Sequence, residues 1–204
     1  MRSMALTAAV LLLAACAPKL ERNAPEPAIY VLSAPAAETG PKLAADLLVL
    51  RPVVPPLLRT ERIATRWNGN RFDYYAGARW SGDVAPVIQA ALVESIRGSG
   101  RVRAVEADPG RFRATHVLGL EVNRLEADYS AGGLPVARVA ITATVARFRD
   151  RKALATWTAS AEQPAAANTL SAVTAAIDEA FGRAGREVVT RAGEALAIDL
   201  AGQP

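Results

Sequence analysis

The spacing of apolar residues along the chain predicts two amphipathic helices and several strands. Apolar side chains recur every three or four residues from Val84 to Ile96 and again from Leu170 to Leu196, which is the period of one helix face. In residues 135–149, apolar side chains alternate with more polar ones, which indicates a strand with one buried face. Further strands are expected at residues 29–32, 46–51, 58–66, 71–75, 102–105, 115–129 and 153–163.

Turn and capping residues set the expected boundaries of these elements. Residues 68–70, with the sequence Asn-Gly-Asn, predict a hairpin between the flanking strands, because Asn and Gly tolerate positive φ. The first helix is expected to be capped near Ser81 or Asp83 and to stop at Gly98 or Gly100. The second helix is expected to be capped by Asn168 or Thr169.

The expected fold class is α+β, with a mainly antiparallel β-sheet and two long amphipathic helices packed on it. If both helices cover the same face of the sheet, the other face is left for a partner, a ligand or water. The expected organisation is a signal peptide at 1–15, a lipidated cysteine and flexible tether at 16–28, and a single α/β domain at 29–204.

The N-terminal residues predict export and attachment of a lipid. A positive residue, Arg2, precedes an apolar run at residues 4–13, which is too short for a transmembrane helix of roughly 20 residues. Leu-Ala-Ala then leads into Cys16 and resembles a bacterial lipobox, where the thiol is acylated and the chain is cut before it. The alternative is an ordinary signal peptide with Cys16 incidental. Ala17 stands where an inner-membrane retention signal would place Asp, so we expect the periplasmic face of the outer membrane.

Charge and composition limit the classes of function. Arg2 leaves with the signal peptide, so 23 of the 24 basic residues and all 20 acidic ones remain, a net charge of +3. This surplus is small for a nucleic-acid-binding protein, and it favours at most a weak preference for anionic head groups or an acidic partner. Cys16 is the only cysteine, so no disulfide is expected and stability must come from packing.

The sequence offers no convincing catalytic or metal-binding constellation. His116 is the only histidine, which excludes the common zinc arrangements, and it is expected to be a hydrogen-bonded strand residue. No G-x-S-x-G or phosphate-binding glycine motif occurs. Glu126 and Asp128 share one strand face and pair in principle as two acids, but a solvated strand end is the favoured interpretation. We therefore expect no enzyme activity, no metal and no cofactor beyond the acyl lipid on Cys16.

Aromatic residues gather between positions 67 and 80, interleaved with arginines, and are the candidate contact residues. Either they form the core where the hairpin meets the first helix, or they form an interface or lipid-contacting rim, since Trp and Tyr suit half-wet surfaces. An RNA-binding surface also has this composition, but the export signal argues against it. The five aromatic residues are Trp67, Phe72, Tyr74, Tyr75 and Trp80.

The order of these motifs resembles the ABC-type transport auxiliary lipoproteins, the PqiC-like group. The motifs are the lipobox, Tyr-Val-Leu at 30–32, Leu-Leu-Val-Leu-Arg-Pro at 47–52 and the segment 62–80 with the helix after it. The resemblance implies a non-enzymatic protein that accompanies an MCE-domain substrate-binding protein and an ABC permease and ATPase. Such systems are thought to move phospholipids or other hydrophobic molecules between the two membranes. The only residue role that the resemblance implies for this sequence is that of Cys16 as the acylated anchor.

Three hypotheses for the function follow. The first is a scaffold whose sheet or aromatic region binds the MCE assembly. The second is a stand-alone periplasmic lipid carrier or chaperone that holds an acyl chain between helices and sheet, and the third is an envelope hydrolase using His116. The sequence does not reveal which substrate is transported or in which direction. It also leaves open whether the protein binds phospholipid and whether it forms a homo-oligomer.

Overall fold

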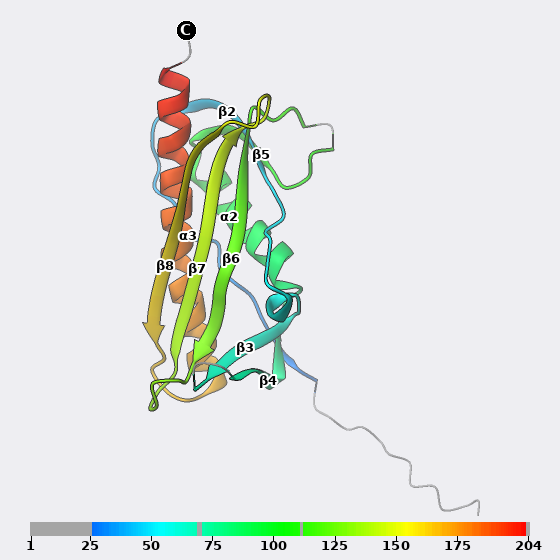
Figure 1. Cartoon of the computed structure of the whole chain (residues 1–204), viewed down its shortest axis with the longest axis vertical. Helices are drawn as coiled ribbons and strands as arrows, with labels where there is room; N and C mark the ends of the chain where they lie inside the picture. The colour runs from blue at the N-terminus through cyan, green and yellow to red at the C-terminus, as the bar shows by residue number, and fades with distance from the viewer. Residues whose placement is uncertain (1–25, 69–70, 111, 203–204) are drawn as a thin grey trace, which may run out of the picture.

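An eight-stranded sheet with two helices on one of its faces forms the protein (Figure 1). The structure is a computed structural model and describes residues 26–68, 71–110 and 112–202. The expected signal peptide, Cys16 and the expected tether up to residue 25 lie outside the described residues. The elements in chain order are β1 (Ala28–Tyr30), β2 (Leu43–Val49), the 3-10 helix η1 (Pro56–Leu58), β3 (Arg62–Trp67), β4 (Arg71–Trp80), α2 (Val84–Ser99), β5 (Val102–Glu106), β6 (His116–Asp128), β7 (Val136–Arg147), β8 (Ala153–Pro164) and α3 (Leu170–Ala201).

Strand β6 organises the sheet because it pairs along both of its edges. One edge pairs with β7, which in turn pairs with β8, both antiparallel. The other edge is shared: its first part pairs parallel to β2, with Leu47 opposite His116, and its last part pairs parallel to β3, with Ala64 opposite Glu126. β5 extends the sheet beyond β2, and β4 and β1 extend it beyond β3.

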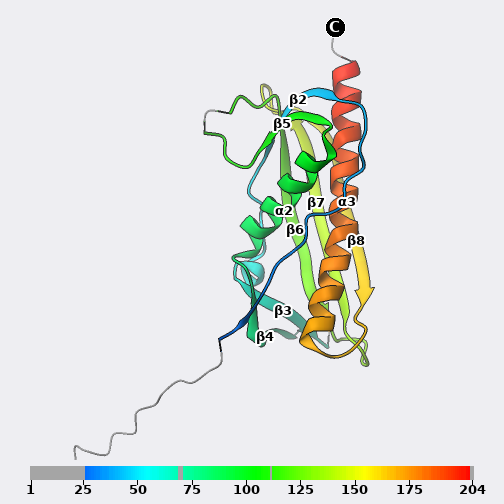
Figure 2. The ribbon, with the colours of Figure 1, turned by 180° about the vertical axis from the view of Figure 1, so that it is seen from behind.

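The expectation of a mainly antiparallel sheet is therefore only partly right, and the α+β class is confirmed. The described strands make four parallel and three antiparallel pairings, so the sheet is mixed. Parallel neighbours need a long crossover connection. The connection from β2 to its parallel neighbour β5 is of this kind. It includes β3, β4 and helix α2, and α2 carries the chain from β4 to β5 at the opposite end of the molecule (Figure 2).

Helix α2 begins and ends close to the residues that the sequence predicts, and α3 begins at one of its two predicted caps. Helix α2 follows Asp83 and ends at Gly100, whose φ of +64° is the left-handed conformation that glycine adopts without strain. The hydroxyl of Thr169 accepts a hydrogen bond from the Ala172 N–H and caps α3. With 32 residues, α3 is about 48 Å long and runs the length of the sheet.

The segment between β1 and β2 crosses the outer side of the two helices (Figure 2). The N–H and hydroxyl of Ser33 both donate to the carboxylate of Asp178 in α3, at 2.7 and 2.8 Å. The hydroxyl of Ser95 in α2 donates to the carbonyl of Pro35 at 2.6 Å. A Cβ atom at Gly185 of α3 would lie 2.4 Å from Cγ of Pro35. The absence of a side chain at Gly185 thus permits this close approach.

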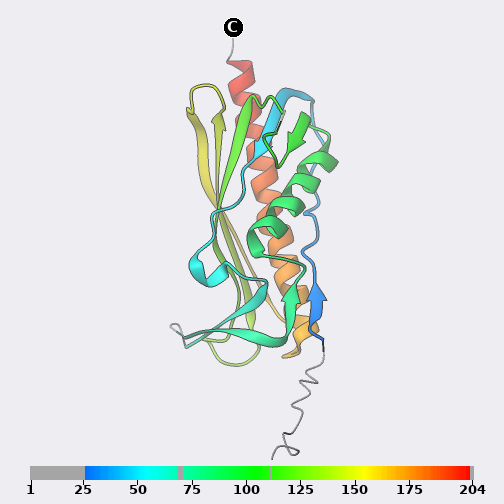
Figure 3. The ribbon, with the colours of Figure 1, turned by 90° about the vertical axis from the view of Figure 1, so that its right-hand side faces the viewer.

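The opposite face of β6, β7 and β8 carries no helix (Figure 3). The alternation expected for β7 is confirmed, because Val139, Ile141, Ala143 and Val145 are buried toward the helices. The side chains between them point to the other side, which we call the uncovered face. No helix in the described part of the chain has both the length and the apolar character needed to cross a bilayer.

Candidate functional site

The uncovered face is polar along β7 and β8. Thr142 of β7 donates to the Asn123 side chain and pairs with the hydroxyl of Thr158, both at 2.9 Å. Thr144 pairs with Thr156 at 3.0 Å in the next row. These neutral hydroxyls neither drive aggregation nor repel a charged partner, so this part of the face suits a reversible polar contact.

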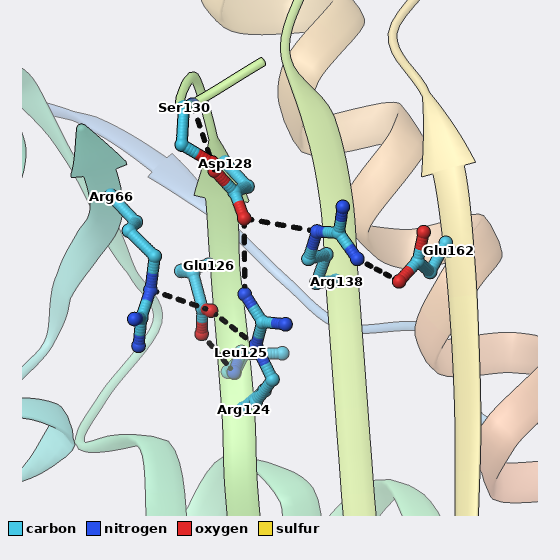
Figure 4. Close-up of polar contacts among 8 residues, drawn as sticks. All are labelled: Arg66, Arg124, Leu125, Glu126, Asp128, Ser130, Arg138 and Glu162. Carbon is cyan, nitrogen blue, oxygen red and sulfur yellow. Dashed lines mark hydrogen bonds and ion pairs between the residues drawn. The ribbon is translucent and has the colours of Figure 1, made fainter. Parts of the chain in front are cut away.

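At one end of the uncovered face, three arginines surround two buried carboxylates (Figure 4). The Glu126 side chain is 2% exposed. Its Oε1 lies 2.7 Å from Nε of Arg124 and 3.5 Å from Nε of Arg66, and its Oε2 accepts from the Leu125 N–H at 3.0 Å. Strand β3 places Arg66 in this network through its parallel pairing with β6.

Asp128 is the second buried carboxylate of the network. Its Oδ2 lies 3.0 Å from Nε of Arg138 and 3.1 Å from Nη2 of Arg124, and its Oδ1 accepts from the N–H and hydroxyl of Ser130. Burial by itself raises the pKa of Asp128, but the hydrogen bonds from Ser130 and Arg124 and the charge of Arg138 outweigh burial. The pKa of this carboxyl is therefore lowered, and it is charged at neutral pH. Arg138 also pairs with Glu162 of β8.

The expectation of a solvated strand end at Glu126 and Asp128 is wrong. Strand β3 pairs alongside this part of β6, and Arg66, Arg124 and Arg138 lie over the two carboxylates. Both carboxylates are instead held by arginine side chains. The alternation Arg124-x-Glu126-x-Asp128 is the one local signal of this network in the sequence.

The three arginine side chains remain accessible while their positions are fixed. Arg66, Arg124 and Arg138 are 36%, 32% and 27% exposed. Because their carboxylate partners already hold them, a partner that binds here orders few additional rotamers, which lowers the entropic cost of association. We refer to these three arginines with Glu126 and Asp128 as the arginine–carboxylate network.

Two of the five candidate aromatic residues continue the uncovered face onto β4. Phe72 and Tyr74 lie opposite Arg66 and Ala64 in the β3–β4 ladder, so they share the face of the network. Their rings meet edge to face with centroids 5.8 Å apart. The guanidinium of Arg62 lies 4.2 Å from the centroid of the Tyr74 ring, a distance typical of a cation–π contact.

The other three candidate aromatics lie elsewhere. Trp80 is 1% exposed and belongs to the core, as one of the two interpretations of the cluster predicts. Trp67 stacks on Tyr129 with centroids 4.1 Å apart and planes 4° from parallel. The hydroxyl of Tyr75 bonds that of Tyr129 at 2.5 Å, and burial together with this bond raises the pKa of Tyr75. The sequence could not reveal Tyr129 as the residue that joins them.

His116 is a buried, hydrogen-bonded strand residue at the other end of β6. Its Nδ1 lies 2.8 Å from the Thr115 hydroxyl, and its Nε2 lies 3.2 Å from Oδ2 of Asp199 in α3. The guanidinium of Arg147 also binds Asp199, with Nε 2.9 Å from Oδ1. An imidazole 2% exposed and bonded at both nitrogens ties the end of α3 to the sheet.

The cavities give little support to a bound acyl chain or metal ion. The cavity between α2, α3 and β2 measures about 10 Å³, roughly the volume needed for one water. A larger hollow of about 690 Å³ lies at the end of α3, and its lining is mixed: polar side chains, among them His116, Arg147 and Arg149, alternate with apolar ones such as Phe148 and Leu200. Among residues 26–68, 71–110 and 112–202, no group of three or more His, Cys, Asp or Glu side chains is arranged to bind a metal ion.

Comparison with known families places the chain. It matches the family of ABC-type transport auxiliary lipoprotein components over residues 30–189. The chain belongs to this family. The resemblance noted from the motif order is thereby confirmed, and with it the assignment as an auxiliary lipoprotein component of an ABC-type transporter. No curated protein matches the chain.

Two solved structures share the fold of this auxiliary lipoprotein. Protein XCC0632 from Xanthomonas campestris is 24% identical, with a TM-score of 0.79 over 84% of this chain and 97% of that chain. The hypothetical protein CT253 from Chlamydia trachomatis is 11% identical, with a TM-score of 0.51 over 76% of this chain and 99% of that chain. Both likenesses support the arrangement of helices and sheet described above.

Proposed function

We propose that this lipoprotein is the non-enzymatic auxiliary component of an MCE-type ABC transport system. Acylation of Cys16 anchors it to the periplasmic face of the outer membrane, and its domain binds the MCE substrate-binding protein of the system. The system moves lipids or other hydrophobic molecules across the cell envelope. The family assignment supports the link to an ABC transporter, and the N-terminal motif supports the anchor.

The observation that carries the binding role is the uncovered face with its arginine–carboxylate network. The helices cover only the other side of the sheet (Figure 3). The network holds charged side chains in fixed positions at the surface without assembling groups for a reaction. A preformed polar surface of this kind is suited to recognising a partner protein through hydrogen bonds and charge complementarity.

The filled interior argues against the stand-alone lipid carrier. An acyl chain held between helices and sheet would need a cavity of several hundred cubic ångströms, but the space there measures about 10 Å³. Ile177, Phe181 and Leu196 of α3 are fully buried in this layer. Lipid would therefore have to separate α3 from the sheet, at the cost of its core contacts.

A charge substitution on the uncovered face tests the binding role. The lipoprotein is purified in mild detergent from native membranes, and the proteins that accompany it are identified by mass spectrometry. We expect an MCE-domain protein with the wild type, and its loss with Thr158→Arg, which places a long cation in the middle of the face. Ala175→Arg, at an exposed position of α3 on the opposite side, is the control and should retain the partner. Equal recovery with both variants would exclude the uncovered face as the binding surface.

A further inference from the structure

One end of the molecule holds three segments (Figures 1 and 3). These are β1, the paired residues Trp67 and Arg71 at the ends of β3 and β4, and the loop 129–135 between β6 and β7. We call them together the tether end. Helix α3 starts at this end and finishes at the opposite one, which also carries the β7–β8 turn (Figure 1).

Each segment of the tether end presents an apolar or aromatic side chain outward. Ile29 of β1 is 58% exposed, and Leu134 of the loop is 50% exposed. Trp67, at the end of β3, is half-buried against Tyr129, and the guanidinium of Arg71 lies 5.2 Å from its ring centroid. Exposed apolar side chains at the same end of the molecule as a tryptophan and an arginine are the composition of a surface that lies in a lipid head-group layer.

The length of the tether limits which end of the domain can reach the membrane. Twelve residues separate Cys16 from Ala28, and at about 3.3–3.6 Å per residue they span at most about 43 Å. Helix α3 is about 48 Å long, and β1 lies at the end where it starts (Figure 1). A fully extended tether is therefore too short for the far end to rest on the membrane that holds Cys16.

We propose that the tether end rests on the lipid surface and sets the orientation of the domain. This inference rests on the proposed acylation of Cys16. Leu134 and Ile29 enter the boundary between head groups and acyl chains, Trp67 lies at head-group depth, and Arg71 binds lipid phosphates. Asp73 is exposed two residues after Arg71, so the contact depends more on the apolar side chains than on anionic lipid.

The other surfaces suit this contact less well. The uncovered face has threonine hydroxyls and ion pairs where a lipid contact needs apolar groups. The far end has the exposed apolar residues Ile198 and Phe148, but the tether keeps it away from the bilayer. With the tether end on the membrane, the uncovered face stands at the side of the domain and remains accessible to a partner.

Quenching of tryptophan fluorescence by bromine-labelled phospholipid tests the contact. Trp80 and Trp157 are 1% and 6% exposed, so Trp67 is the tryptophan able to report it. The full lipoprotein, with acylation of Cys16 verified by mass spectrometry, is reconstituted in vesicles of phosphatidylethanolamine and phosphatidylglycerol with brominated acyl chains. We expect quenching that Trp67→Phe abolishes. Leu134→Asp should weaken it about twofold or more, because an exposed leucine is replaced by a charge that resists the apolar layer.

Ile198→Asp is the matched control, since it makes the same kind of change at an exposed position of the far end, and it should leave the quenching unchanged. Unquenched wild-type emission, or equal effects of Leu134→Asp and Ile198→Asp, would overturn the proposal. Partner recovery is measured in parallel for the same protein variants, purified in mild detergent from native membranes. Recovery of the MCE protein without quenching refutes only the membrane contact, whereas quenching without that protein refutes only the proposed function.

Discussion

Arg138 of β7 binds Asp128 of β6 across the uncovered face, with Nε 3.0 Å from Oδ2. Arg124 and Ser130 bind the same carboxylate. The negative charge of Asp128, which is only 7% exposed, is therefore balanced by arginines and hydrogen bonds on a face that no helix covers. The uncovered face is thus ordered by the protein's own contacts. A partner meets a fixed arrangement of charges there, which favours specific recognition.

The stability that Asp128 provides should be lost in acid. The pKa of this carboxyl is lowered from its ordinary value of 3.8, so the unfolded state takes up the proton at higher pH than the folded state. Its contribution is therefore present above about pH 4 and is lost as the pH falls through the folded pKa. At neutral pH we expect Asp128→Asn to lower the free energy of unfolding by about 1–3 kcal/mol.

Denaturant unfolding of the wild type and Asp128→Asn over a series of pH values measures this effect. Other carboxylates titrate in both proteins, so the difference between the two curves isolates Asp128. That difference should be largest near neutral pH and should shrink below about pH 4. A difference independent of pH would contradict the assignment of a charged, ion-paired Asp128.

Two glycines of α3 should respond in opposite ways to the same substitution. At Gly185 a Cβ atom would lie 2.4 Å from Cγ of Pro35, so Gly185→Ala must displace the crossing segment. We expect a loss of about 1–3 kcal/mol in the free energy of unfolding. At Gly182 nothing lies within 4 Å, and Gly182→Ala should stabilise the helix by about 0.5–1 kcal/mol. Thermal unfolding of both variants decides the matter, and equal effects would contradict the close approach of Pro35 to α3.

The C-terminal turns of α3 should depend on Asp199. Arg147 and His116 both bind its carboxylate, and Asp199→Asn weakens both contacts in a buried site. We expect faster amide hydrogen exchange near the end of α3 and a loss of about 1–3 kcal/mol in stability. Glu194→Gln, at an exposed position of the same helix, is the control and should change stability by less than about 0.5 kcal/mol. Unchanged exchange in Asp199→Asn would show that this contact does not hold the helix end.

The elements that the sequence predicted well are those set by local rules. The period of apolar residues located α2 and α3. Thr169, one of the two residues predicted to cap α3, is its cap. The alternation of side chains identified the buried side of β7. Each of these signals lies within a few residues of the structure that it specifies. Strand limits were less accurate, because tertiary pairing extends β4 to Trp80 and starts β2 at Leu43.

The arrangement of the strands and the site depended on contacts between distant residues. The sharing of one edge of β6 by β2 and β3 is not visible in any local pattern, so the parallel pairings were missed. The same pairing brings Arg66 to Glu126, sixty positions later in the sequence. Glu126 and Asp128 therefore looked solvated from their own strand alone, and Tyr129 could not be recognised as the partner of Trp67.

Photo-crosslinking from the uncovered face in intact cells tests the central claim most directly. A photo-crosslinking residue replaces Thr158 on this face or, as a control, Ala175 on the outer side of α3, and the captured proteins are identified after irradiation. The proposed function predicts an adduct with the MCE substrate-binding protein from position 158 and none from position 175. An adduct with that protein from position 175 alone, or from neither position while the lipoprotein is correctly anchored, would contradict it.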